Sequence, residues 1–205
     1  MNPKETALIL IGYQNDYFSP EGVLHQVFQE DGAVDRVRDR TLALLEALRD
    51  TPVTLISTPI CFTPDYQEIA EPVGILEVIK ETGAFQAGAF GSETIPELKR
   101  FGQRIVEVPG KRGLNAFMGT HLGEVLRERG IQDVVLAGAV TTICIDSTGR
   151  SAFEQGFRVH VLEDCTLARS AFEQRFYCEQ IFPLYAQVLD SGALLTELGV
   201  EVDAA

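Results

Sequence analysis

Apolar runs that are typical of strands alternate with helical segments along the whole of this chain. The first run, Thr6–Ile11 (TALILI), is apolar from its second residue onward, as is usual for a parallel strand with both faces covered. Ala33–Arg49 follows and repeats its apolar residues at helical spacing. This alternation predicts a doubly wound α/β fold with a mostly parallel sheet of about six strands.

The remaining elements follow from the same two periodicities. The further strands are expected at Val53–Ser57, Arg104–Val108, Asp133–Ala137, Arg158–Leu162 and Gln187–Leu189. The further helices are expected at His121–Arg129, Ile143–Gln155 and Ser191–Leu198, with Ser170 and Glu173 at the start of one more. Between these elements, Pro59–Glu97 is a long connection. Connections of this length usually belong to a functional site or an oligomer contact.

The composition limits the class of protein and its partners. With 205 residues, 45% of them hydrophobic, the chain can bury one core, and we expect a single domain over residues 1–205. A net charge of −13 argues against nucleic acid or an anionic membrane surface as a partner. No apolar run approaches the roughly 20 residues that cross a bilayer. The start, MNPKET, lacks the layout of a signal peptide, so we expect a cytoplasmic protein.

Three stretches that follow expected strands carry residues capable of chemistry. They are Gly12–Phe18, Lys111–Phe117 and Ala139–Cys144. The carboxyl ends of parallel strands meet at one edge of a sheet, where α/β proteins place their sites. We therefore expect the three stretches to converge on one site for a small-molecule substrate.

Cys144 is the most informative of these residues. In Leu136–Asp146 (LAGAVTTICID) a buried strand ends, Gly138 opens a turn and a helix begins. The N–H groups at a helix N-terminus favour an anion, so they favour the thiolate and could also hold an oxyanion. The other interpretation is that the residue is a small buried hydrophobe.

The cysteines as a group indicate no metal or disulfide framework. No two of them have C-x-x-C spacing, so free thiols in a reducing compartment and no bound metal or other cofactor are expected. The four are Cys61, Cys144, Cys165 and Cys178.

Three motifs in order resemble those of the isochorismatase-like cysteine hydrolases. They are GYQNDYF, KRGLNAFMGTHL, and AGAVTTIC followed by GFRVHVLEDC, and the resemblance runs from about Ala7 to Leu195. It implies a three-layer α/β/α fold with a mostly parallel six-stranded sheet. It also implies an Asp–Lys–Cys triad that acts on amides and related C–N bonds.

Carried over residue by residue, the resemblance assigns roles to several positions. Cys144 falls on the nucleophile, and Lys111 falls on the triad lysine of a K-x-x-x-S-A-F pattern in which Asn115 replaces serine. Val140–Thr141 falls where the family has a cis peptide that aims N–H groups at an oxyanion. By analogy, the backbone amides of Thr141 and Cys144 form the oxyanion hole.

The triad aspartate is missing. The family pattern D-x-Q-N-D-F begins with it, whereas this chain has Gly12 there, with Gln14, Asn15 and Asp16 still in register. Asp16 could turn inward as a substitute acid, a carboxylate could come from residues 59–97 or a neighbouring subunit, or Lys111 could move the proton. Asp16 could equally be a loop residue that binds backbone N–H groups.

The missing carboxylate also bears on the substrate pocket. Its absence is expected to enlarge the pocket beside Tyr13. The residues expected to line this pocket are Gly12, Tyr13, Gln14, Asn115 and Phe117.

The resemblance narrows the activity without fixing the substrate. STPICFTPD lacks the Asp/His set that binds metal in nicotinamidases, which argues against a nicotinamidase. Isochorismatases proper keep the triad aspartate, which argues against that activity as well. We expect a metal-independent hydrolase of a small amide, carbamoyl or ester substrate that works through a Cys144 thioacyl intermediate. The alternative is a ligand-binding or interaction module that has lost the triad aspartate and the reaction. In either case a homo-oligomer, a dimer or tetramer, is expected.

Overall fold

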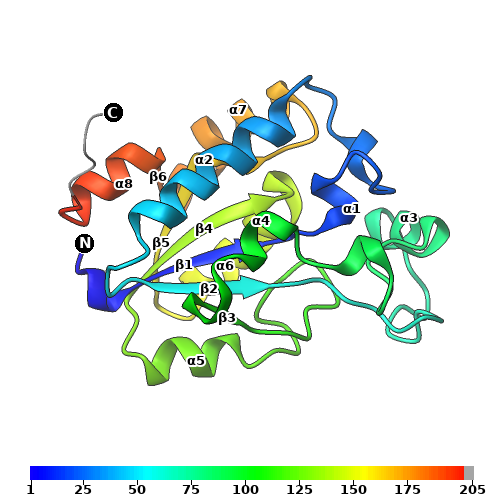
Figure 1. Ribbon diagram of the computed structural model, residues 1–205, viewed down its shortest axis with the longest axis horizontal. Coiled ribbons are helices and arrows are strands. Elements are labelled where there is room, and N and C mark those ends of the chain that lie inside the picture. Colours follow the sequence, from blue (N-terminus) through cyan, green and yellow to red (C-terminus); the bar gives the residue numbers. More distant parts are fainter. Residues whose placement is uncertain (201–205) are drawn as a thin grey trace.

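The computed structural model describes residues 1–200, and the last five residues of the predicted domain lie outside this part. Its centre is a six-stranded sheet in the order β3-β2-β1-β4-β5-β6, in which every neighbouring pair is parallel (Figure 1). The strands are β1 (Thr6–Ile11), β2 (Thr54–Thr58), β3 (Ile105–Glu107), β4 (Asp133–Ala139), β5 (Arg158–Leu167) and β6 (Gln187–Leu189). The predicted doubly wound α/β fold is confirmed.

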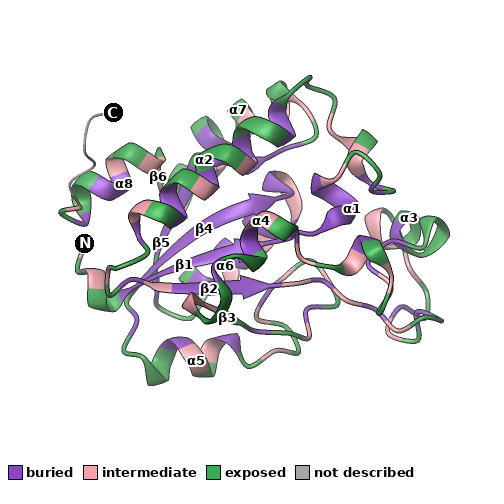
Figure 2. Cartoon of the chain, viewed as in Figure 1, coloured by how far each residue is buried: buried purple, intermediate pink, exposed green. Residues whose placement is uncertain are grey.

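Helices cover both faces of this sheet and bury its middle strands. The helices are α1 (Asn15–Phe18), α2 (Ala33–Ala47), α3 (Ile75–Thr82), α4 (Pro96–Lys99), α5 (Leu122–Glu128), α6 (Asp146–Glu154), α7 (Ala171–Phe176) and α8 (Ser191–Glu197). Side chains of α2 and α8 pack on one face, and side chains of α5 and α6 pack on the other. Every residue of β1 and β4 is buried, as their apolar sequences predict. Figure 2 shows the buried sheet between helices whose outer sides are exposed.

The two strands next to the expected site are longer than predicted. β4 continues through Gly138 to Ala139, and β5 continues to Leu167. Gly138 therefore lies inside a strand and does not open the turn. Its φ of +125° and a distance of 1.9 Å from an added Cβ to the carbonyl oxygen of Ile11 explain why glycine stands there.

The segment between residues 59 and 97, which is expected to be a long connection, has regular structure of its own. It contains α3, a short 3₁₀ turn at Phe90–Ser92 and the start of α4. The aromatic ring of Phe85, within it, is fully buried in the main core. This segment is therefore packed against the sheet domain along much of its length.

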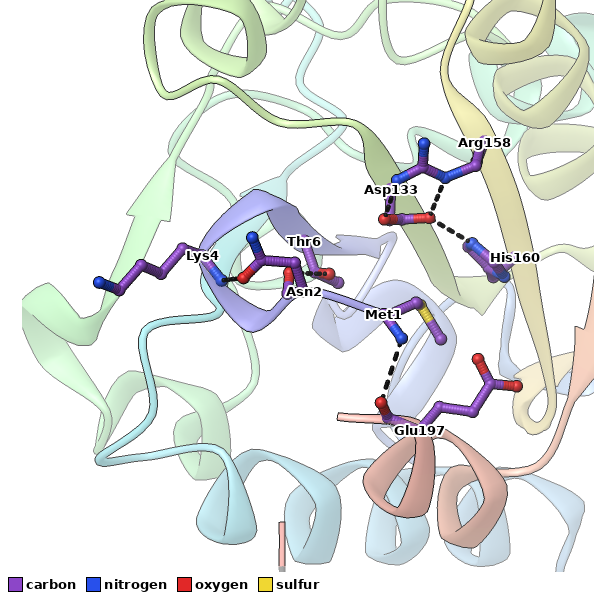
Figure 3. Close-up of polar contacts among 8 residues, drawn as sticks. All are labelled: Met1, Asn2, Lys4, Thr6, Asp133, Arg158, His160 and Glu197. Carbon is purple, nitrogen blue, oxygen red and sulfur yellow. Dashed lines mark hydrogen bonds and ion pairs between the residues drawn. The ribbon is translucent and has the colours of Figure 1, made fainter. Parts of the chain in front are cut away.

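Charged residues gather at the amino end of the sheet (Figure 3). Asp133 at the start of β4 accepts hydrogen bonds from Arg158 at 2.8 and 2.6 Å and from Nε2 of His160 at 2.9 Å. Burial raises the pKa of Asp133, but the hydrogen bonds from Arg158 and His160 outweigh it, and the pKa is lowered. This end of the sheet is thus closed by a buried carboxylate with two basic partners.

None of the helices within residues 1–200 has the length and apolar character that a membrane crossing requires.

Candidate active site

Lys111 and Cys144 meet at the carboxyl end of the sheet. Lys111 follows β3, and its backbone pairs with Ile60 and Cys61 at the end of β2. Its side chain is fully buried, and the ammonium donates hydrogen bonds to the carbonyl oxygen of Gly113 and to Sγ of Cys144, the latter at 3.5 Å. A buried ammonium requires such partners, and here one of them is a thiol.

Among residues 1–200, no carboxylate forms an ion pair with Lys111. The positive charge of Lys111 is therefore available to stabilise a thiolate at Cys144.

Cys144 lies in a π-helical turn, Thr141–Ile145, that leads into α6. The first four N–H groups of a helix have no acceptor within it. In this turn the N–H of Ile143 bonds back to the carbonyl oxygen of Val140 at 3.1 Å. The N–H groups of Thr141 and Cys144 also lie in this first turn, where donors can face an oxyanion.

The cis peptide lies one residue earlier than expected. It joins Ala139 to Val140, so the prediction of Val140–Thr141 is wrong. The reason is the length of β4, because Ala139 still pairs with Leu167 of β5. The chain therefore leaves the sheet at the bond between Ala139 and Val140.

Gln174 of α7 holds this turn, and the sequence reasoning missed it. Oγ1 of Thr141 donates to Oε1 of Gln174 at 2.7 Å. The amide nitrogen of Gln174 donates in turn to the carbonyl oxygen of Glu163 and to Oγ1 of Thr166, both at 3.0 Å. Gln174 thus ties the Cys144 turn to the end of β5. No local pattern distinguishes it from other polar residues on a short helix.

Gly12 at the end of β1 adopts a left-handed conformation with a φ of +73°. A Cβ added there would lie 2.9 Å from the carbonyl oxygen of Ala139 and 3.4 Å from two ring carbons of Tyr17. The ring of Tyr17 therefore borders the space beside Gly12. That the missing carboxylate enlarges the pocket beside Tyr13 stays a prediction.

Comparison with known proteins agrees with this architecture. The profile of the isochorismatase domain matches residues 6–193. The chain belongs to the isochorismatase family.

Relatives within the isochorismatase family span most of the chain. The isochorismatase family protein YecD of Escherichia coli is 29% identical over 202 residues, which cover 97% of this chain and 98% of YecD. Ureidoacrylate amidohydrolase RutB of Caulobacter vibrioides is 28% identical over 183 residues, covering 81% of this chain and 78% of RutB. The crystal structure of a cysteine hydrolase from Pseudomonas syringae has a TM-score of 0.83 at 23% identity, covering 97% and 94% of the two chains. At this identity, the structural likeness shows a shared fold.

Two residues that were expected to line the pocket point elsewhere in this isochorismatase family member. The hydroxyl of Tyr13 lies 2.6 Å from Oγ1 of Thr41 and donates to the carbonyl oxygen of Cys165 at 3.1 Å, inside the core. Burial raises the pKa of Tyr13. The amide group of Gln14 binds both the N–H and the carbonyl oxygen of Ile60 at 2.7 Å. The structure does not bring either side chain to Cys144.

Asp16 is also engaged away from the thiol. Its carboxylate accepts hydrogen bonds from the backbone N–H groups of Phe85 at 2.6 Å and Val23 at 3.3 Å. The carboxylate lies so close to Gly91 that a Cβ there would be 2.1 Å from Oδ1. Of the two interpretations of Asp16, this geometry matches the loop residue that binds backbone N–H groups.

The loop after Lys111 brings Asn115 and Phe117 near the same edge. Oδ1 of Asn115 accepts from the N–H of Phe117 at 2.8 Å, and the N–H of Ala116 donates to Oγ1 of Thr148 on α6 at 3.0 Å. The ring of Phe117 is half-buried and stacks on Phe157 at a centroid distance of 6.3 Å. These contacts fix the loop against the helix that follows Cys144.

The other three thiols are less suited to nucleophilic chemistry. Burial raises the pKa of Cys61, that of Cys165, and that of Cys178 to about 12. Cys61 lines a groove of about 410 Å³ beside β3, which contains neither Lys111 nor Cys144. In the part of the chain that the structure describes, Cys144 is the thiol that has an ammonium within hydrogen-bond distance. No group of three or more His, Cys, Asp or Glu side chains within residues 1–200 could hold a metal ion.

Proposed function

We propose that this chain is a cysteine hydrolase that cleaves the C–N bond of a small amide or carbamoyl substrate, with activated esters as further substrates. The observation that supports it best is the Lys111–Cys144 pair, with 3.5 Å between Nζ and Sγ, at the start of a helical turn. The family to which the chain belongs agrees with a hydrolase. The amidohydrolase name of RutB favours an amide or carbamoyl compound.

The proposed reaction starts from the Cys144 thiolate, which Lys111 stabilises by its charge. The thiolate attacks the carbonyl carbon, and the N–H groups of Thr141 and Cys144 donate to the oxyanion of the tetrahedral intermediate. When the C–N bond breaks, the nitrogen takes up a proton and leaves as an amine or ammonia, and a thioacyl group remains on Cys144. Water then hydrolyses this thioester and regenerates the thiolate.

The test compares the wild type with Cys144→Ala and with Cys61→Ala as a matched control. Ureidoacrylate is the first substrate, followed by an N-carbamoyl amino acid and a simple carboxamide, with release of ammonia or amine as the readout. We expect the Cys144 variant to lose hydrolysis and the Cys61 variant to keep it. Acid-quenched wild type should carry the acyl mass on the peptide that contains Cys144.

Hydrolysis that survives Cys144→Ala would refute the proposal. A wild type that binds these compounds without hydrolysing them would instead favour the ligand-binding module.

We also propose that the chain forms a homo-oligomer. Large apolar side chains are exposed, among them Phe172 of α7 at 67% and Leu184 at 75%. Such residues are often covered by a partner. A mass near 22.5 kDa in light scattering would contradict this.

A further inference from the structure

Tyr17 borders the space beside Gly12. It lies in α1, the single helical turn directly after β1. Ring carbons Cδ2 and Cε2 lie 3.4 Å from the position that a Cβ of Gly12 would take. That position is 2.9 Å from the carbonyl oxygen of Ala139, where β4 ends and the Cys144 turn begins. The ring therefore lies beside the end of β1 and close to the end of β4.

The ring is fixed in this place. Phe85 contacts it edge-on at a centroid distance of 4.9 Å, and Phe28 contacts it at 5.6 Å. The carbonyl oxygen of Tyr17 accepts a hydrogen bond from Nδ1 of His25 at 3.0 Å. These two aromatic contacts and the backbone hydrogen bond give the hydroxyl a defined position.

The hydroxyl of Tyr17 is not used by the fold. Among residues 1–200 it makes no hydrogen bond, whereas the hydroxyls of Tyr13, Tyr66 and Tyr185 all make one. The hydroxyl oxygen also keeps some contact with solvent. If it were fully enclosed, it would be a buried polar atom without a partner, and within residues 1–200 the atom of that kind is Nδ1 of His160. A hydroxyl that is unpaired on a side chain only 2% exposed is a donor that the fold leaves unused, and such a group calls for an explanation.

Burial raises the pKa of Tyr17, and the nearby Cys144 and then Asp16 raise it further. The hydroxyl therefore stays protonated and remains a donor. Asp16 itself is held by the N–H groups of Phe85 and Val23.

We propose that the hydroxyl of Tyr17 is the proton donor for the leaving nitrogen, in place of the carboxylate that Gly12 lacks. The inference rests on the proposed function. When the C–N bond breaks, the electron pair goes to nitrogen and the Tyr17 proton goes with it, leaving a tyrosinate and a neutral amine. The tyrosinate then takes a proton from the attacking water, whose oxygen joins the acyl carbon, and the Cys144 thiolate departs. Water and amide are thus converted to acid and amine.

The test uses two probes that share an acetyl group and differ in the leaving atom. para-Nitrophenyl acetate releases a stable phenolate that needs no proton, whereas para-nitroacetanilide releases an amine that does. Tyr17→Phe keeps the ring and removes the hydroxyl. We expect it to lower kcat on the anilide by about 10²–10⁴-fold, the usual contribution of a positioned general acid. Turnover of the ester should stay close to that of the wild type.

Tyr13→Phe is the matched control, because its hydroxyl is also buried but is bonded to Thr41 and Cys165. This control should leave the ratio of ester to anilide turnover unchanged. A Tyr17→Phe variant that slows both probes alike, or neither, overturns the proposal, as does a wild type that cleaves the ester and not the anilide. Failure of the proposed function gives another result, since Cys144 would then not be acylated by the ester in the wild type.

Discussion

A buried charged side chain lies at each end of the sheet, and the two have different kinds of partner. At the amino end, Asp133 is buried and is bonded to both Arg158 and His160. At the carboxyl end, Lys111 is buried and is bonded to a carbonyl oxygen and a thiol. A charge that is neutralised by opposite charges contributes to stability, whereas a charge that faces a neutral, ionisable group can stabilise a reactive anion. The difference separates a structural end of the sheet from a chemical end.

The largest effect is expected at the carboxyl end of the sheet, where a substitution should lower activity. Lys111→Met keeps the length of the side chain and removes its charge from Cys144. We expect kcat/KM for the best amide to fall by about 10²–10³-fold, as when a transition-state donor is lost. The urea midpoint should change little, because replacing a buried charge by an apolar group of similar volume is often neutral.

The matched control for this prediction is Lys99→Met, which removes an exposed ammonium that pairs with Glu93 at 2.7 Å. Equal losses from the two lysine variants would mean that net charge, and not the Lys111–Cys144 contact, explains the result.

The opposite pattern is expected at the amino end. Asp133→Asn removes the charge that holds Arg158 and His160 in place. We expect a loss of about 1.5–3 kcal/mol in the free energy of unfolding, measured with urea, because the buried carboxylate loses its charge-assisted hydrogen bonds. kcat/KM should be unchanged. Glu46→Gln, which breaks the exposed pair with Arg49, should cost at most about 1 kcal/mol.

At the carboxyl end of the sheet, the backbone at Gly12 also requires glycine. Gly12→Ala places a Cβ at a φ of +73° and 2.9 Å from the Ala139 carbonyl oxygen. We expect a loss of about 1–2 kcal/mol in the free energy of unfolding. Gly88→Ala is the control, since Gly88 has a φ of +80° with nothing within 4 Å of its Cβ position. If both variants lose the same stability, the close contact at Gly12 adds nothing.

The smallest expected effect is a change in stability that occurs only at acidic pH. Since the pKa of Asp133 is lowered in the fold, its contribution to stability is present above its unfolded value of about 3.9 and is lost as the pH falls through the folded value. The stability difference between wild type and Asp133→Asn should therefore shrink below about pH 4. Urea midpoints across this range measure it. A difference that stays constant down to the lowest pH would contradict the assignment.

The sequence predicts the frame of this molecule better than the surroundings of its site. Apolar runs such as Thr6–Ile11 mark the buried strands, because both faces of β1 are covered. The strand ends and the motif resemblance place Lys111 near Cys144. Helical periodicity does not distinguish the π-helical turn at Thr141–Ile145 from an α-helix, so the start of α6 was placed too early.

Long-range contacts explain the remaining differences. Nothing local indicates that Tyr17, five residues after Gly12, turns its ring back against it, because Phe85 and Phe28 set the direction of that ring. The hydrogen bond between Thr141 and Gln174 likewise depends on how α7 packs. Such contacts form only when distant segments come together.

The attachment of residues 59–97 determines how a molecule can reach Cys144, which is only 3% exposed. Gln14 binds Ile60 and the carbonyl oxygen of Ser92, and Asp16 binds the N–H of Phe85, so this segment is fastened to the end of β1 at several points. The opposite rim, residues 112–120, exposes Met118 at 74% and has no regular helix or strand. We expect molecules to enter past the exposed part of this rim around Met118, since Ala116 and Phe117 are held by hydrogen bonds. The amide hydrogens of Met118 and Gly119 should exchange with solvent orders of magnitude faster than those of Ile60 and Phe85.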